Sequence, residues 1–206
     1  MNLNEGIIEY CSKLEGWSSE AKMLALANII VENKVDTSVE IGVWGGRGLI
    51  SMAMAHRQLE HQGYPKTCAY GIDPWAARPC VEGKNDKEND EWWGKQDFEK
   101  IYADFIFNVA AHHLRPWCVW FRQRADQAIA RFKPNSIGLL HQDGNHSAEV
   151  SQQEVNDWWP LIKPGGFLVA DDTLWPSLQD TQKLILSKGA ILTSDNGDWR
   201  IYQKPR

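Results

Sequence analysis

Three carboxylates follow two predicted strands of this chain, at the points where those strands end. Asp143 comes after residues 137–142, and the pair Asp171 and Asp172 comes after residues 167–170. Neighbouring parallel strands end at the same edge of a sheet, so we expect these side chains to lie close together. Like charges this close repel unless a proton or cation intervenes, and Mg²⁺ prefers such oxygen ligands. All three are therefore candidate Mg²⁺ ligands.

Two structural readings of the acid pair stay open at this stage. Successive strand residues point to opposite faces, so Asp171 and Asp172 share an ion only if the strand ends and the chain turns there. Solvated turn carboxylates, or a cap for a helix starting near residue 177, produce the same pattern.

His146 lies three residues after Asp143. A neutral imidazole with an ordinary pKa of about 6.5 is suited to removing a proton from a hydroxyl group at neutral pH. His146 is therefore a candidate general base, although a polar loop residue would look the same. His141, on the preceding strand, receives no role.

A glycine-rich loop, Glu40-Ile-Gly-Val-Trp-Gly-Gly-Arg-Gly48, follows the predicted strand at residues 38–43. Glycines let the backbone turn tightly and approach a ligand, although the dinucleotide fingerprint G-x-G-x-x-G is not met. Asp73 ends the next predicted strand, where a carboxylate accepts hydrogen bonds from both hydroxyls of a ribose. Together the loop and Asp73 favour an adenosine-containing ligand over a plain tight turn with a capping acid.

The apolar spacing predicts helices and strands in alternation. The expected helices are 4–15, 18–33, 49–61, 97–113, 126–132, 148–162 and 177–188. The expected strands are 38–43, 67–73, 117–121, 137–142, 167–170, 190–193 and 199–203, the last two forming a hairpin. Lys163-Pro-Gly-Gly166 is expected to end the helix at residues 148–162. This order predicts an α/β fold: a Rossmann-like three-layer sandwich with a mostly parallel seven-stranded sheet and an antiparallel C-terminal strand.

We expect one domain over residues 1–206, with residues 1–35 as an N-terminal helical cap. Residues 74–96 are polar and show no clear periodicity, which predicts a lid or acceptor-binding loop. Trp75, Trp92 and Trp93 within it, and Trp175 beyond it, are candidate walls for an acceptor; packing of a lid or a dimer contact are the alternatives for the Trp92–Trp93 pair.

The composition limits the function further. A net charge of -5 with scattered Lys and Arg argues against a nucleic-acid partner. The sequence shows no signal peptide and no apolar run long enough to span a bilayer, so we expect no membrane partner. The 4 cysteines form no CxxC pair and are expected to be reduced in a cytoplasmic protein. The sequence does not decide the oligomeric state, and a homo-oligomer is possible.

These motifs, in this order, resemble the class I S-adenosylmethionine-dependent methyltransferases over residues 38–175. Glu40-x-Gly-x-x-x-Gly46 is similar to motif I of that family, and Gly71-Ile-Asp-Pro-Trp75 to its acidic second-strand motif. Leu140-His-Gln-Asp-Gly-Asn-His-Ser147, Trp158-Trp-Pro-Leu-Ile-Lys-Pro-Gly-Gly166 and Val169-Ala-Asp-Asp172 resemble the O-methyltransferase branch of macrolide-sugar and cephamycin-type enzymes. Asp171-Asp-Thr-Leu-Trp175 also resembles the catechol and caffeoyl-CoA branch.

The resemblance implies a cofactor site. Glu40 would contact the amino group of the methionine part, Gly42 and Gly46 would allow close backbone approach, and Trp44 would flank the methionine. Asp73 would bind the ribose.

Further along the chain, Asp126 would bind the adenine amino group, and we also expect Asp143 to border the cofactor. Gly48 departs from the family, in which Ser is common, so a side-chain contact at that point is in doubt.

The resemblance also implies the chemistry. Asp172 stands where the antibiotic-sugar branch has its third metal ligand and the catechol branch has Asn, and His146 stands where the family holds a base. We therefore expect a divalent-metal-dependent O-methyltransferase of a small sugar or polyol-bearing metabolite, less so of a catechol. A metal-independent methyltransferase of another target and a non-catalytic nucleotide-binding protein remain as alternatives, and the sequence does not identify the acceptor.

Overall fold

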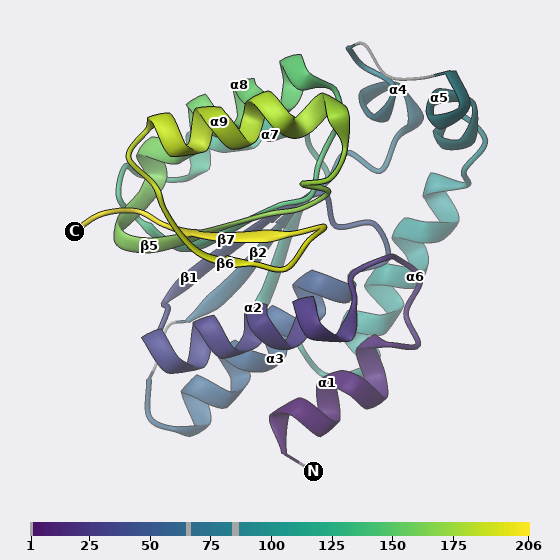
Figure 1. The fold of residues 1–206 in the computed structure, drawn as a ribbon. Coiled ribbons are helices and arrows are strands. Elements are labelled where there is room, and N and C mark those ends of the chain that lie inside the picture. The colour runs from purple at the N-terminus through teal and green to yellow at the C-terminus, as the bar shows by residue number, and fades with distance from the viewer. Residues whose placement is uncertain (1, 65–66, 84–86) are drawn as a thin grey trace.

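The computed structural model describes residues 2–64, 67–83 and 87–206, and they form one seven-stranded sheet with helices on both faces (Figure 1). The strands are β1 (Thr37–Ile41), β2 (Cys68–Ile72), β3 (Cys118–Phe121), β4 (Ile137–Gln142), β5 (Ile162–Ala170), β6 (Ile191–Asp195) and β7 (Arg200–Gln203). Their order is β3-β2-β1-β4-β5-β7-β6. Strands β1 to β5 pair in parallel, and β7 runs antiparallel to both β5 and β6. The predicted fold class is confirmed.

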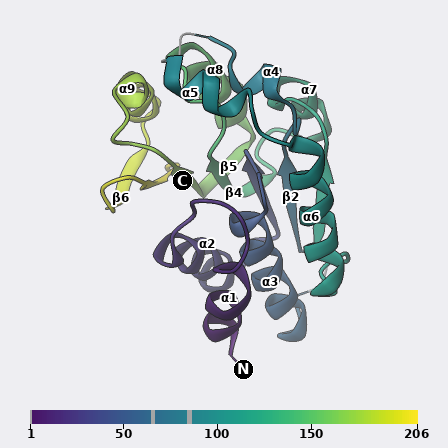
Figure 2. The ribbon, with the colours of Figure 1, turned by 90° about the vertical axis from the view of Figure 1, so that its right-hand side faces the viewer.

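Seven of the described α-helices divide into two groups, and each group covers one face of the sheet (Figures 1 and 2). One face carries α1 (Leu3–Cys11), α2 (Glu20–Asn33), α3 (Arg47–His61) and α6 (Phe98–Ala111). The other carries α7 (Ala125–Ala128), α8 (Ala148–Trp158) and α9 (Gln179–Ser187). Each group buries its own apolar cluster, one around Met23, Leu49 and Phe105 and one around Val155 and Trp158. Burial of these side chains stabilises the layered arrangement.

Several helices begin at the polar residue that the backbone requires there. The side chains of Asn2, Ser19, Asp97 and Ser147 accept hydrogen bonds from the free amides of the first turns of α1, α2, α6 and α8. The start of α2 matters most for the site, because Lys22 lies in its first turn. In the described part of the chain, every helix is too short or too polar to cross a membrane.

The segment 74–96 is more ordered than we expected. It contains α4 (Ala77–Cys80) and α5 (Lys87–Trp93), while residues 84–86 of the predicted lid lie outside the described residues. Figures 1 and 2 place both short helices beyond the carboxyl ends of the central strands. Apolar periodicity did not predict these two helices, because neither of them contains a buried residue.

Strand β5 starts earlier than the sequence predicted. Ile162 pairs with Ile137 of β4 and Phe167 pairs with Leu139, so residues 163–166 form an irregularity inside the strand. The Pro-Gly-Gly sequence was expected only to stop a helix. Here it also allows the strand to bulge, since Gly165 has a φ of 78°.

Candidate active site

The carboxyl ends of β1, β2, β4 and β5 border one cleft of about 710 Å³. It lies where β1 has β2 on one side and β4 on the other, the switch point at which open α/β sheets bind ligands. Of the predicted site residues, the cleft is lined by Glu40, Gly42, Trp44, Asp73, Asp126, Asp143, His146, Asp171 and Asp172. Gly46 does not line it; an added Cβ there would lie 2.7 Å from the Phe105 ring, so Gly46 shapes the turn from behind.

The glycine loop and the end of β4 come very close together. The amide of Gly42 donates to the Ile72 carbonyl, and the amide of Asp143 donates to the Ile41 carbonyl, each at 2.9 Å. A Cβ added at Gly42 would lie 1.8 Å from the backbone oxygen of Asp143. Only glycine fits at this point, so Gly42 sets the approach of the β1 and β4 loops.

Glu40 forms a buried pair with His141, the histidine to which we assigned no role from the sequence. Glu40 Oε1 lies 2.8 Å from His141 Nδ1, and both side chains are closed to solvent. Burial raises the pKa of Glu40, while His141 and Lys22 oppose that rise. The second oxygen, Glu40 Oε2, is buried and has no hydrogen-bond partner in the described structure. An acceptor left in this state at a cleft wall is suited to a ligand cation or amino group.

Gly48 is explained by the same pair. A Cβ at this position would lie 1.9 Å from Glu40 Oε1 and 3.4 Å from His141 Nδ1. The serine that the family resemblance led us to expect has no room beside this carboxylate, so packing explains the glycine at this position.

Asp73 is held by the backbone around it. Its Oδ2 accepts from the amides of Val43 and Trp44, each at 2.9 Å, and its Oδ1 accepts from the amide of Trp75 at 2.6 Å. Burial raises the pKa of Asp73, and the three amide hydrogen bonds oppose the rise. A carboxylate has about four acceptor positions, so about one remains for a ribose hydroxyl rather than the two that we expected.

Asp143 lies close to each of the other two carboxylates predicted as metal ligands, in two separate groups of possible ligands. Possible ligand atoms of Asp143, Asp171 and His141 lie within 4.8 Å of one another, and so do those of Asp143, Asp172 and His146. Strand β5 ends at Ala170. Asp172 has a φ of 52°, so the chain turns there, as a shared site requires.

The pKa values of Asp143 and Asp171 shift in opposite directions. Burial raises the pKa of Asp143 well above its ordinary value, and the neighbouring Asp171 raises it further. Burial acts the same way on Asp171, but the Lys22 ammonium and His141 outweigh it and hold its pKa below the ordinary value. A positive charge at the cluster therefore favours the ionised form of Asp171, while Asp143 carries the cost of burial beside a like charge.

Lys22, which the sequence analysis missed, supplies one positive charge to this cluster. Its ammonium forms an ion pair with Asp171 Oδ2, and the two side chains are only 5% and 6% exposed. No sequence pattern marks Lys22 as a site residue, because a lysine in the first turn of an amphipathic helix is ordinarily a surface residue. Only the packing of α2 on α3 brings Lys22 to the strand ends.

His146 lies at the outer side of the cluster. Its Nε2 is 2.8 Å from Asp172 Oδ2, and its ring centroid is 4.4 Å from that of Trp175. The side chain is 16% exposed, so it faces the cleft while a carboxylate and an aromatic ring hold its orientation. This is the geometry of a general base with an orienting acid.

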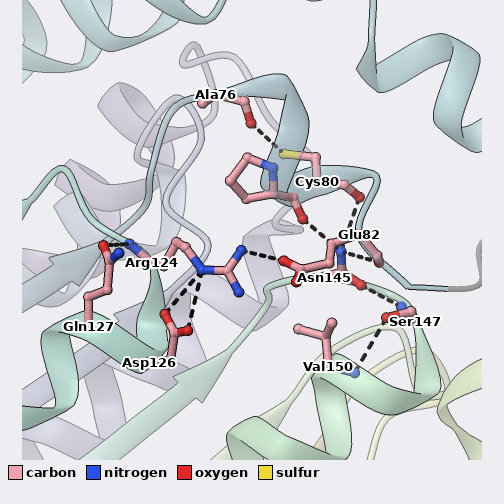
Figure 3. Close-up of polar contacts among 10 residues, drawn as sticks. Ala76, Cys80, Glu82, Arg124, Asp126, Gln127, Asn145, Ser147 and Val150 are labelled. Carbon is pink, nitrogen blue, oxygen red and sulfur yellow. Dashed lines mark hydrogen bonds and ion pairs between the residues drawn. The ribbon is translucent and has the colours of Figure 1, made fainter.

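Asn145 connects residues 79–82 to the loop that follows β4 (Figure 3). Its Nδ2 lies within hydrogen-bond distance of the carbonyl oxygens of Pro79, Cys80 and Glu82, at 2.9, 3.1 and 3.0 Å. Its Oδ1 accepts from the amide of Ser147 at 2.7 Å. One side chain therefore ties α4 to the loop that carries His146.

Asp126, the predicted adenine ligand, lies beside Arg124 (Figure 3). The Arg124 Nε donates to Asp126 Oδ1 at 3.1 Å, and the guanidinium also contacts Glu82. Both Asp126 and Arg124 line the cleft, so a ligand at this end meets a carboxylate that is already paired.

Tryptophans form the roof of the cleft. Trp17, Trp44, Trp92 and Trp93 contact one another with ring centroids 4.9 to 6.0 Å apart, and all four line the cleft. They join the loop before α2, the glycine loop and α5. The Trp92–Trp93 pair therefore packs within this roof.

Trp75 does not line the cleft, although it was a candidate wall. It is 1% exposed and packs on Phe105 and Tyr102, and its Nε1 donates to the Trp44 carbonyl. Trp75 is a core residue that supports the glycine loop.

Arg47 supports the loop that carries Trp17, and the sequence analysis did not identify it as a site residue. Its guanidinium donates to the carbonyl oxygens of Ser12, Leu14 and Ser18, at 2.8, 2.7 and 3.3 Å. These bonds fix the loop that carries Trp17. The arginine stands inside the glycine motif, where the sequence drew attention only to the glycines.

Comparison with known proteins decides the class of this molecule. A family model described as a methyltransferase domain matches residues 39–173, which run from β1 past the acid pair. The chain belongs to this methyltransferase domain family. It is a class I S-adenosylmethionine-dependent methyltransferase, as the motifs around Glu40 and Asp73 predicted. A search of curated proteins gives no match.

Solved structures of methyltransferases share the fold of this chain. The O-methyltransferase NovP superposes with a TM-score of 0.71 and 15% identity, over 93% of this chain and 84% of NovP. A putative caffeoyl-CoA O-methyltransferase from Staphylococcus aureus gives a TM-score of 0.66 and 15% identity, over 99% and 93% of the two chains. TomG from Streptomyces achromogenes, an O-methyltransferase of tomaymycin synthesis solved with S-adenosylmethionine, gives 0.63 and 12%, over 100% and 91%. At these identities the likeness shows the fold alone.

Proposed function

We propose that this methyltransferase transfers the methyl group of S-adenosylmethionine to a hydroxyl oxygen of a small sugar or polyol-bearing molecule, with a divalent ion, Mg²⁺, at the acidic cluster. One observation carries the proposal: the unpartnered Glu40 oxygen, the cluster of Asp143, Asp171 and Asp172, and the side chain of His146 all line one cleft.

The residues at the β1 end fit the methyl donor. Glu40 Oε2 is a buried acceptor without a partner, which suits the ammonium of the methionine part. Gly42 and Trp44 would flank this part, Asp73 would accept one ribose hydroxyl, and Asp126 would lie near the adenine amino group. The bound donor would supply a methyl group on a sulfonium sulfur, which an oxygen nucleophile attacks in line.

The residues at the β4 and β5 ends fit a hard cation. The donors of Asp143, Asp171 and Asp172 are all carboxylate oxygens, the ligand type that Mg²⁺ prefers. Burial and the charge of Asp171 raise the pKa of Asp143, and a divalent ion bound there would oppose that rise. Such an ion would lower the pKa of an acceptor hydroxyl and hold its oxygen in place.

His146 is the residue that we assign to proton removal. Its Nε2 faces Asp172 at 2.8 Å, so the carboxylate stabilises the imidazolium that forms when the acceptor hydroxyl gives up its proton. The ring of Trp175 and the tryptophan roof would exclude water and position the acceptor carbon skeleton.

Oxygen as the acceptor atom is supported by the structural relatives. NovP, TomG and the Staphylococcus aureus protein are all named as O-methyltransferases. A second proposal, metal-independent methyl transfer, is favoured by the Lys22–Asp171 ion pair, because an ammonium already neutralises part of the cluster.

An assay of S-adenosylhomocysteine release over a panel of sugars, polyols and catechols tests both proposals. We expect turnover with a hydroxyl acceptor that EDTA abolishes and Mg²⁺ restores. Asp143→Asn should lose this turnover, while Asp180→Asn, which alters an exposed acid on α9, should keep it. Turnover that is unchanged by EDTA would establish the metal-independent route instead.

A further inference from the structure

Lys22 reaches the acidic cluster from a different part of the fold than the acids do. The acids follow β4 and β5, whereas Lys22 belongs to the first turn of α2, 149 residues before Asp171. The Lys22 ammonium contacts Asp171 Oδ2, and the pair is closed off from water almost completely. A lysine at this depth needs a permanent negative partner, because burial of an unpaired ammonium is costly.

The surroundings of this lysine are acidic. Its ammonium pairs with Asp171, and the carboxylates of Asp143 and Asp172 add negative charge at the same strand ends. The ion pair therefore places a buried cation at the acidic cluster of the metal-free protein.

The carboxylate that Lys22 contacts also belongs to a group of possible metal ligands. Asp171 Oδ2 is 3.9 Å from His141 Nε2, and Asp143 completes that triad within 4.8 Å. An ion bound by Asp171 would share this carboxylate with the Lys22 ammonium, and two neighbouring cations repel each other strongly in a site from which water is largely excluded. An ion at the cluster must either displace the ammonium from Asp171 or bind against its charge.

We propose that Lys22 is a built-in competitor for the divalent ion: it fills the electrostatic role of the ion when the site is free, and it weakens ion binding when the ion arrives. This inference rests on the proposed metal site. Under this proposal, the charge of Lys22 on α2 lowers the affinity of the carboxylates for the ion.

The charge balance gives the physical reason for such a residue. Three carboxylates around one small volume repel one another, and a protein without a resident cation would depend on metal to fold its site. With Lys22 in place, the metal-free protein keeps the ends of β4 and β5 together. The cost is a lower affinity for the ion.

The test compares wild type with Lys22→Met, which keeps the length of the side chain and removes its charge. Mn²⁺ binding is measured by titration calorimetry and by electron paramagnetic resonance of the free ion, without acceptor or methyl donor. We expect the dissociation constant of Mn²⁺ to fall at least about tenfold in Lys22→Met. We also expect the melting temperature of the variant to be lower than that of wild type in EDTA and to rise further than that of wild type on addition of Mn²⁺.

Two further variants control the comparison. Lys22→Arg keeps the charge and should keep the wild-type affinity, and Lys133→Met removes an exposed lysine and should change nothing. If Lys22→Met does not fold, Lys22→Gln gives the same comparison, because its amide still donates to Asp171 without carrying charge.

The outcomes separate this inference from the function on which it rests. Equal Mn²⁺ affinity of folded wild type and Lys22→Met would overturn the role of Lys22 and leave the metal site standing. Absence of Mn²⁺ binding by wild type and by every variant would overturn the metal site and the inference together.

Discussion

Glu40 Oε1 and His141 Nδ1 lie 2.8 Å apart in a pair that solvent does not reach, and this pair leaves the other oxygen of Glu40 without a partner. The imidazole fixes the carboxylate, and Gly48 leaves the space in which it lies. The end of β1 thus presents one preoriented acceptor oxygen to the cleft.

Glu40→Gln should therefore weaken binding of S-adenosylhomocysteine by about tenfold to a hundredfold, since a charge-assisted hydrogen bond contributes about 1.5–3 kcal/mol. Gly48→Ala should have a similar effect, because the new Cβ would displace Glu40 Oε1. Titration calorimetry measures both affinities.

The control for these variants is 5′-methylthioadenosine, which lacks the amino acid part. Its affinity should be the same in wild type and in Glu40→Gln. An equal loss for both ligands would show that the substitution harms the whole cleft, and it would contradict the assignment of Glu40 to the amino group.

The sequence predicted that the acids at the ends of the strands line one cleft, because their positions follow from the topology of the sheet. Any residue that ends β1, β2, β4 or β5 of a parallel sheet arrives at the same edge. The topology alone therefore predicts that Glu40, Asp73, Asp143 and the acid pair lie at one edge of the sheet.

The residues that the sequence missed depend on tertiary packing. Lys22 and Arg47 act through contacts with segments far from them in the chain, at Asp171 and at the loop around Ser12. Periodicity shows which face of a helix is apolar and does not show which side chain crosses to a strand end. His141 was missed for the same reason, since an isolated histidine on a strand has no spacing to interpret. The prediction that Trp75 is a cleft wall was wrong. The sequence does not show whether an aromatic residue beside a motif points into the core or into the cleft.

Arg47→Met should loosen the roof of the cleft. The loop at residues 12–18 loses three hydrogen bonds from the guanidinium, and Trp17 in that loop loses its support. We expect faster amide hydrogen exchange over residues 12–18, a several-fold weaker affinity for S-adenosylhomocysteine and a loss of about 1–3 kcal/mol of stability.

Arg115→Met is the matched variant, since Arg115 is exposed and stacks on Trp120 away from the cleft. It should leave hydrogen exchange over residues 12–18 unchanged. Equal exchange of this loop in wild type and Arg47→Met would show that the guanidinium does not hold it.

Glu154 should make the stability of the protein depend on pH. Burial raises its pKa from 4.5 to about 7, and hydrogen bonding from Gln142 opposes the rise. The folded state thus keeps a proton that the unfolded chain loses above pH 4.5, so this group favours folding at low pH and that contribution is lost as the pH rises through 7.

Glu154→Gln removes this titration. The free energy of unfolding of wild type, measured relative to that of the variant by urea denaturation, should fall as the pH rises from 4.5 to 7. Glu149→Gln, an exposed substitution on the same helix, should show no such trend relative to wild type. A difference between wild type and Glu154→Gln that stays constant over this range would contradict the raised pKa.

The most direct measurement of the central claim is a crystal structure with S-adenosylhomocysteine and Mn²⁺. We predict the amino nitrogen of the ligand within hydrogen-bond distance of Glu40 Oε2, its ribose at Asp73, and an anomalous Mn²⁺ peak among Asp143, Asp171 and Asp172 in the same cleft. S-adenosylhomocysteine bound outside this cleft, or with its amino group directed away from Glu40, would contradict the account.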